Sequence, residues 1–251
     1  MAIMRKIIEA ASAAGAALMD AVFPRTCVVC GVALVDGEDA MCAGCLSELP
    51  RTRLHLMPFN TIHHRVGHKV ALDIAAGWFY YQRDSPYAQL IRRVKYDDRP
   101  ALARLLGRMY GAELLADGFD MTRYDLLLPV GMHPRKRMSR GYNQSYEIAL
   151  GLGDSLGLPV AGNLVALRGH KSQTRHNADE RHANISGSFG VVRPDQLRDR
   201  NIIIVDDIIT TGATVRDCGV ALLEEAEPAS LSVLSIGVTR MTGGANARRR
   251  S

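Results

Sequence analysis

Beyond Tyr124 the sequence alternates short apolar runs with segments of helical periodicity. The runs DLLLPVG, NLVALR, NIIIVDDI and LSVLSIGVT predict buried strands, and ISGSFGVV predicts a further one. Helices are predicted between them near residues 143–157 and 213–226. Apolar strands that alternate with helices form βαβ units, in which helices cover both faces of a parallel sheet. The second half of the chain is therefore predicted to be an α/β domain.

The 251-residue chain is long enough for one substantial core and a small appended module. We expect an N-terminal amphipathic helix (residues 1–24) followed by a cysteine module (25–58). A hood or connecting region (59–123), the α/β domain (124–240) and a disordered basic tail (241–251) complete the chain. In the connecting region, ALDIAAGWFYY predicts a strand, and a helix from Tyr87 to Leu115 is expected to restart at Pro100. Proline is tolerated in the first turn of a helix.

The N-terminus begins with basic residues and alanines, as secretory signal peptides do. Glu9, however, falls where a signal peptide is apolar, and apolar residues recur at helical spacing from Ile7 to Val22. No apolar run reaches the roughly 18 to 20 residues of a membrane span. We therefore expect a docked amphipathic helix and a cytoplasmic protein.

The stretch 201–215, NIIIVDDIITTGATV, places two adjacent acids and a hydroxyl-rich turn after an apolar strand. Ligands of open parallel sheets bind beyond the carboxyl ends of the strands, and N–H groups that begin a helix form an anion cradle. The predicted cradle consists of Thr210, Thr211, Gly212, Ala213 and Thr214. Asp206 and Asp207 would repel a bound phosphate unless they accept hydrogen bonds from vicinal ribose hydroxyls. This predicts a sugar phosphate ligand; the alternative is an ordinary turn with a polar helix cap.

Two CxxC pairs, Cys27 with Cys30 and Cys42 with Cys45, are separated by residues 31–41. Four thiolates on two tight turns close a tetrahedron around Zn²⁺, and such a fully occupied site is structural rather than catalytic. Disulfides or redox motifs are the alternatives, but neither explains paired turns in a segment that is poor in core residues.

Basic residues gather in the middle of the chain, which carries a formal net charge of +5. Between Arg92 and Arg181 there are 15 basic and 10 acidic residues, and the rest of the chain is balanced. The loop PVGMHPRKRMSRGYNQ (129–144) follows the first strand of the α/β domain, at the edge where the cradle is predicted. The segment 168–184 is again arginine-rich, and we expect it to close over a ligand as lids do. The alternative for both segments is a solvated basic loop.

These motifs resemble two known patterns. An apolar strand, paired acids and T-T-G-x-T resemble the 5-phosphoribosyl-1-pyrophosphate (PRPP) loop of type I phosphoribosyltransferases. The CxxC pairs, IRRVKY (91–96), RGYNQ (140–144) and the string Gln173, Glu180, Arg181, Asn184 and Phe189 resemble the ComF family of competence-associated, phosphoribosyltransferase-like proteins. The resemblance spans about residues 15–240. Gly131 and Tyr142 stand where the family more often has proline and phenylalanine.

The resemblance implies a type I phosphoribosyltransferase-like parallel sheet flanked by helices, preceded by a small zinc module, a double zinc ribbon. It implies that residues 210–214 hold the 5′-phosphate of PRPP. It also implies that the catalytic residues are Asp206 and Asp207, which contact the 2′- and 3′-hydroxyls of the ribose, with Mg²⁺ bridging hydroxyls and pyrophosphate. The residues expected at a pyrophosphate or nucleic-acid phosphate are Arg135, Lys136, Arg137, Arg140, Asn143, Gln144, Gln173 and Arg181.

Three functions follow as hypotheses. The first is an enzyme that transfers ribosyl phosphate from PRPP–Mg²⁺ to an unassigned acceptor. The second is a protein that handles single-stranded DNA in natural transformation, with DNA-uptake proteins as partners and PRPP as a regulator or unused. Basic residues and the aromatics Trp78, Tyr80, Tyr96 and Tyr142 suggest it, although core packing is the better interpretation of Trp78. The third is a degenerate fold whose zinc module docks a protein partner.

Overall fold

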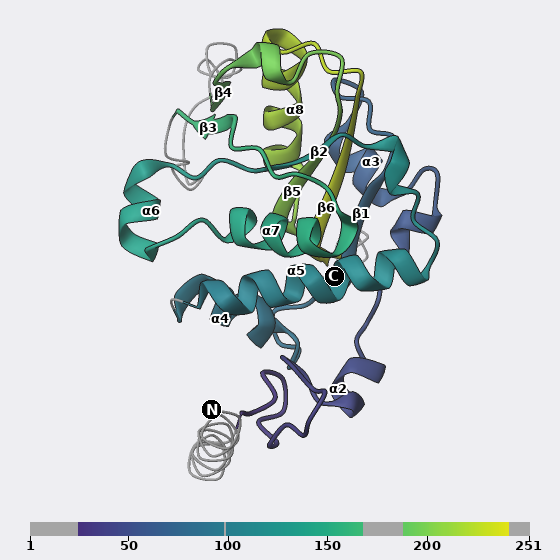
Figure 1. The fold of residues 1–251 in the computed structure, drawn as a ribbon, viewed down its shortest axis with the longest axis vertical. Coiled ribbons are helices and arrows are strands. Elements are labelled where there is room, and N and C mark those ends of the chain that lie inside the picture. Colours follow the sequence, from purple (N-terminus) through teal and green to yellow (C-terminus); the bar gives the residue numbers. More distant parts are fainter. Residues whose placement is uncertain (1–24, 98, 168–187, 241–251) are drawn as a thin grey trace, which may run out of the picture. The chain divides into compact units, whose positions relative to one another are not determined.

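The structure, a computed structural model, describes residues 25–97, 99–167 and 188–240 (Figure 1). The predicted N-terminal helix, the segment with Gln173 and Arg181, and the predicted tail lie outside the described residues. The chain divides into two compact units between Leu49 and Pro50. Residues 50–58, which the sequence analysis assigned to the cysteine module, therefore belong to the larger unit.

The larger unit is built on a four-stranded sheet with the order β1-β6-β5-β2 (Figure 1). Its strands are β1 (Ala75–Tyr81), β6 (Ser230–Thr239), β5 (Asn201–Ile209) and β2 (Leu126–Pro129). All neighbouring pairs are parallel, and Ile204 of β5 pairs with Leu128 on one side and Val233 on the other. The middle of β5 is fully buried, as expected for a strand covered on both faces. The predicted α/β fold with a parallel sheet is confirmed.

The membership of the sheet differs from the prediction at β1, which joins it, and at β3, which lies outside it. β1, expected in a hood, pairs with β6 as an edge strand of the sheet. The run NLVALR, expected in the parallel sheet, forms β3 (Leu164–Ala166), which pairs antiparallel with β4 (Phe189–Val191) in a separate two-stranded sheet. β3 has three residues, of which only Leu164 is buried, so it lacks the two covered faces of a parallel strand.

Helices surround the sheet of the larger unit. They are α3 (Thr61–Val66), α4 (Ala88–Tyr96), α5 (Pro100–Ala116), α6 (Pro134–Arg140), α7 (Gln144–Leu156) and α8 (Ala213–Glu225). Short 3₁₀ helices span Leu54–Leu56, Met121–Arg123 and Pro194–Gln196. The predicted restart at Pro100 is confirmed, since this proline begins α5. No described helix is long and apolar enough to cross a membrane.

Helices α5 and α7 lie side by side along the sheet (Figure 1). Glycines permit this approach: a Cβ on Gly107 would lie 2.3 Å from the carbonyl oxygen of Ile148, and one on Gly151 would lie 1.9 Å from that of Arg104. Leu106 of α5 and Ile148 of α7 are both buried. Since α7 also packs on β5, this close pairing fixes the start of α7 beside the sheet.

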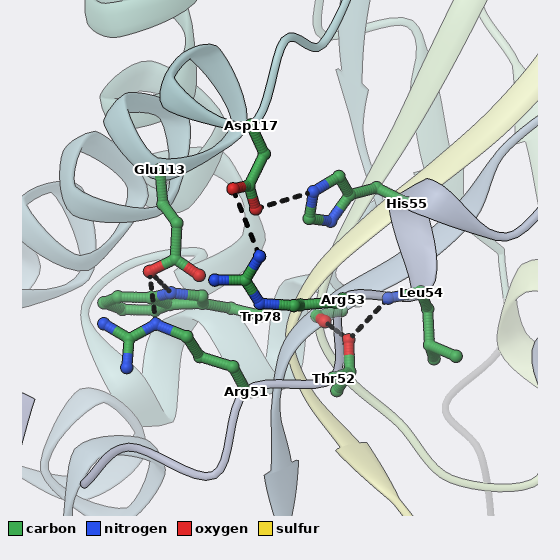
Figure 2. A network of polar contacts seen from close by, with 9 residues as sticks. Arg51, Thr52, Arg53, Leu54, His55, Trp78, Glu113 and Asp117 are labelled. Carbon is green, nitrogen blue, oxygen red and sulfur yellow. Dashed lines mark hydrogen bonds and ion pairs between the residues drawn. The ribbon is translucent and has the colours of Figure 1, made fainter. Parts of the chain in front are cut away.

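A polar network fastens the first residues of the larger unit to the end of α5 (Figure 2). Glu113 accepts hydrogen bonds from Arg51 Nε at 2.8 Å and from Trp78 Nε1 at 3.0 Å. Asp117 accepts from His55 Nε2 at 3.0 Å and from Arg53 at 3.4 Å. Trp78 is buried, as predicted, and its indole N–H finds the partner that a buried indole needs.

Candidate functional site

A cavity of about 340 Å³ lies at the carboxyl ends of β2 and β5. The predicted site residues that line it are Lys136, Arg140, Asn143, Gln144, Asp206, Asp207, Thr210 and Thr214. Gly212 and Ala213 line a smaller cavity of about 20 Å³ beside the same loop, whereas Arg135, Arg137 and Thr211 line neither. Gln173 and Arg181 lie outside the described residues. One cavity therefore brings together acids, cradle residues and basic residues from distant segments.

The loop after β5 has the geometry of an anion cradle. Gly212 is the N-cap of α8 with φ +78°, a left-handed conformation that glycine adopts without strain. The first N–H groups of a helix have no partner within the helix, and the helix dipole favours an anion near them. β5 extends one residue beyond the predicted run NIIIVDDI, to Ile209, because Ile208 and Ile209 still pair with β6.

The two acids have different surroundings. Asp206 is 8% exposed and accepts hydrogen bonds from Ser145 Oγ at 3.2 Å and from the N–H of Asp207 at 2.8 Å. Burial, together with the neighbouring charge of Asp207, raises the pKa of Asp206 to about 7. A carboxyl group with this pKa exchanges its proton near neutral pH.

Asp207 forms an ion pair with a lysine to which the sequence analysis gave no role. Lys95 Nζ, in the last turn of α4, lies 3.1 Å from Asp207 Oδ2. The carbonyl of the adjacent residue, Val94, accepts a hydrogen bond from the Tyr142 hydroxyl. Phenylalanine, which the ComF family more often has at this position, could not donate this bond. Tyr142 thereby ties the end of α4 to the segment 140–144 and helps to place Lys95.

The start of α7 contributes an amide with an unused donor. Gln144 is 1% exposed, and its Oε1 accepts a hydrogen bond from Arg140 at 3.2 Å. Among the described residues, its buried Nε2 has no hydrogen-bond partner. Leaving a buried polar group unsatisfied costs about 1–3 kcal/mol, so an acceptor in the cavity would relieve this cost. Asn143 instead caps α7 through Ser145 N–H and donates to the Val130 carbonyl, which is a positioning role.

Two further residues shape the loop between β2 and α7. His133 lines the cavity and caps α6, its Nδ1 accepting from the Arg135 N–H at 3.2 Å. Gly131 packs tightly against β3, since a Cβ there would lie 2.4 Å from the carbonyl oxygen of Leu164. Any larger residue than glycine at position 131 would therefore clash with the backbone of β3.

The four cysteines of the smaller unit have the geometry of a metal site. Their Sγ atoms all lie within 4.8 Å of one another. Cys30 and Cys42 Sγ are 3.8 Å apart, and tetrahedral Zn²⁺ with Zn–S bonds near 2.3 Å requires a separation of about 3.8 Å. The Cys45 N–H donates to Cys42 Sγ at 3.5 Å, as in tight CxxC turns. No disulfide joins the described cysteines, so these residues fit one structural Zn²⁺.

Known proteins are similar to the cysteine module and to most of the rest of the chain. A family model described as "Double zinc ribbon domain" matches residues 18–55. "DNA utilization protein YhgH" of Escherichia coli K12 is 27% identical and covers 82% of this chain and 94% of its own length. "Competence protein ComFC" of Bacillus subtilis 168 is 26% identical, and the match covers 87% of this chain and 92% of that protein. "Competence protein F" of Haemophilus influenzae is 29% identical, and the match covers 53% of this chain and 59% of that protein.

Solved structures also align with the chain, with TM-scores below 0.5. The "allosteric regulatory enzyme of purine biosynthesis" is 19% identical and covers 58% of this chain and 30% of its own, with a TM-score of 0.40. Purine phosphoribosyltransferase from Pyrococcus horikoshii is 15% identical and covers 53% and 83%, with a TM-score of 0.33.

The sheet, the loop after β5 and the four-cysteine site define an α/β protein with a parallel sheet and a zinc-ribbon module. Over most of its length the chain is similar to these proteins, whose names are those of competence and DNA utilization proteins.

Sequence reasoning missed several residues of this site. Lys95 lay in a quoted motif without a role, and Ser145 and His133 were not singled out. Arg65 was missed as well, although its side chain hydrogen-bonds the Thr210 carbonyl across 145 positions of sequence. No local spacing relates these residues to the phosphate loop, so only the folded chain brings them there.

Proposed function

We propose that this protein binds PRPP, or a closely related ribose 5-phosphate, together with Mg²⁺ in the cavity at the carboxyl ends of β2 and β5. The observation that carries the proposal is that Asp206 and Asp207 share one cavity with the loop that begins α8. A phosphate on that loop and a vicinal diol on the acids satisfy both groups at once. A ligand with only one of these groups would contact either the loop or the acids, but not both.

The rest of the cavity supports a second, larger anion. Lys136 and Arg140 line it, and their charges suit the pyrophosphate of PRPP. The unpaired Nε2 of Gln144 supplies a neutral donor for a phosphate oxygen. Mg²⁺ takes oxygen ligands and would neutralise part of the pyrophosphate charge. The side-chain oxygens of Asp207, now paired with Lys95, are suited to that ion or to a ribose hydroxyl.

Such a ligand supports one type of reaction. An acceptor forms a bond to C1′ of the ribose while the bond from C1′ to pyrophosphate breaks and pyrophosphate leaves with its electron pair. Binding is the part of this proposal that the cavity supports directly, and transfer to an acceptor is the step beyond it.

Calorimetric titration of PRPP with Mg²⁺ present tests the proposal. We expect saturable binding with one site per chain, and a loss of about ten- to a hundredfold in affinity for Asp207→Ala, since a hydrogen bond to a charged acceptor contributes about 1.5–3 kcal/mol. Asp154→Ala, which removes an acid paired with Arg104 on the surface between α5 and α7, is the matched control and should bind as the wild type does. Absence of binding to the wild type would refute the proposal.

One observation favours a second function, the handling of single-stranded DNA during natural transformation. Tyr96 is 74% exposed, and the guanidinium carbon of Arg140 lies 5.8 Å from the centre of its ring. Exposed aromatics beside arginines are where nucleic-acid bases stack. The relatives' names, "DNA utilization protein" and "Competence protein", are consistent with this role and with DNA-uptake proteins as partners.

Fluorescence anisotropy with a labelled oligothymidylate tests this second function. We expect binding at low salt that weakens steeply as salt rises, and that weakens about fivefold or more in Tyr96→Ala because a stacked base contributes about 1–3 kcal/mol. If the oligonucleotide does not bind at low salt, the second function is excluded while PRPP binding is unaffected.

A further inference from the structure

Arg65 joins the phosphate loop to the end of a neighbouring strand. It lies in α3, and its Nη1 donates to the Thr210 carbonyl at 2.8 Å. Nη1 also lies 3.3 Å from Thr239 Oγ1, and Nη2 donates to the Thr239 carbonyl at the end of β6. One guanidinium group therefore holds the carbonyl oxygens of both segments, and Thr239 Oγ1 adds a longer hydrogen bond to the Thr210 carbonyl at 3.4 Å.

The backbone of α3 is in contact with the same loop. A Cβ on Gly212 would lie 2.9 Å from Arg65 Cβ and 3.2 Å from the Arg65 carbonyl oxygen. Gly212 also has φ +78°, so both the space and the conformation require glycine. The loop is thus packed against α3 on one side while its N–H groups begin α8.

The helix that carries Arg65 is itself anchored to the core. The Asn60 side chain caps α3, and His63 completes a capping box by accepting from the Asn60 N–H at 3.1 Å. Asn60 Nδ2 donates to the carbonyl oxygens of Leu54 and Ala75, at 3.2 and 2.8 Å. Leu54 belongs to the segment that the network of Figure 2 fastens to α5. Arg65 therefore extends from a rigid support.

We propose that Arg65 is a positioning residue that holds the loop 210–214 in its anion-binding conformation. Its hydrogen bond engages the Thr210 carbonyl on the α3 side, so this oxygen, an acceptor that would repel a phosphate, stays away from the N–H groups at the start of α8. The inference rests on the proposed function for the identity of the anion, but the conformational role belongs to the free protein. Arg65 does not line the cavity, which distinguishes it from Lys136 and Arg140.

Hydrogen–deuterium exchange of the free protein tests the conformational role. In Arg65→Gln we expect the amides of residues 208–216 to exchange about tenfold faster, because a hydrogen bond to a charged donor is lost. Amides of β2 and α5 should exchange as in the wild type. Arg198→Gln is the control: it removes an arginine of equal charge, paired with Glu227, just before β5 begins, at the opposite end of the strand from the loop.

Titration of the same variants with PRPP–Mg²⁺, and with inorganic phosphate as a second probe, tests the consequence for binding. We expect Arg65→Gln to bind about tenfold more weakly. Arg65→Lys should restore part of the loss, because its single ammonium can reach the Thr210 carbonyl but cannot hold both segments. This lysine variant also serves if Arg65→Gln does not fold.

The outcomes separate this inference from the proposed function. If the wild type fails to bind PRPP but Arg65→Gln accelerates exchange in residues 208–216, the proposed ligand is wrong and the positioning role stands. If the wild type binds PRPP and the folded Arg65 variants exchange and bind as it does, the positioning role is overturned and the proposed function stands.

Discussion

The metal site and the ligand cavity differ in how their residues are distributed along the chain. All four cysteines lie between Cys27 and Cys45, within the smaller unit, and their spacing alone predicts the site. The cavity instead draws Lys95, Gln144 and Asp207 from α4, α7 and β5. The first site depends on two short turns and one ion, whereas the second depends on the packing of the whole larger unit. Changes in the two regions should therefore have separate consequences.

The largest expected effect is loss of the metal. Because a small unit without its own large core depends on zinc for folding, Cys30→Ser, or removal of zinc by a chelator, should unfold residues 25–49. Zinc content and hydrogen exchange measure this, and exchange in β5 and β6 should not change. Equal acceleration of exchange in both units would contradict the separation.

Next in size is a pH effect on the stability of the larger unit. The pKa of Asp206 is raised in the folded protein, to about 7 from 3.8, so the folded state binds more protons than the unfolded state between these values. Stability must then fall as pH rises from about 4 to 7, by a few kcal/mol at most, since one pKa unit corresponds to about 1.4 kcal/mol. Urea unfolding at pH 5 and pH 8 measures the fall. It should be smaller in Asp206→Asn, and an equal fall in both proteins would contradict the assignment.

A smaller effect is expected from the lysine beside Asp207. Lys95→Gln removes the cation at 3.1 Å and leaves Asp207 without an ion pair. We expect PRPP–Mg²⁺ to bind about tenfold more weakly, because a cation is lost from a site that takes a polyanion, while zinc content is unchanged. Lys69→Gln, outside the cavity lining, is the control. Unchanged affinity in Lys95→Gln would show that the ion pair takes no part in binding.

The smallest effect should come from Tyr142→Phe. This change removes only the hydroxyl that donates to the Val94 carbonyl, so it should cost about 0.5–1.5 kcal/mol in stability. Thermal unfolding measures the cost, and the affinity for PRPP–Mg²⁺ should fall by less than in Lys95→Gln. A larger loss of affinity than for Lys95→Gln would mean that Tyr142 acts on the ligand and not through α4.

The same contrast explains what could be predicted from the sequence. The strand, acids and turn of residues 201–215 are contiguous in the sequence, so the sequence alone predicts their chemistry. The same holds for the two CxxC pairs. Local pattern did not place β1 in the sheet or β3 outside it, because strand pairing is decided by partners distant in sequence. For the same reason it assigned no role to Lys95 or Arg65, whose partners Asp207 and Thr210 follow more than a hundred residues later.

The most direct test of the central claim compares ribose 5-phosphate with 2-deoxyribose 5-phosphate by calorimetric titration of the wild-type protein. If the phosphate binds the loop at Thr210–Thr214 while Asp206 and Asp207 accept from the adjacent hydroxyls, ribose 5-phosphate should bind about tenfold more tightly, since one hydrogen bond to a charged group is lost with the 2′-hydroxyl. PRPP–Mg²⁺ should bind more tightly than either. Equal affinities for the two sugars, or no binding of all three ligands, would contradict the account.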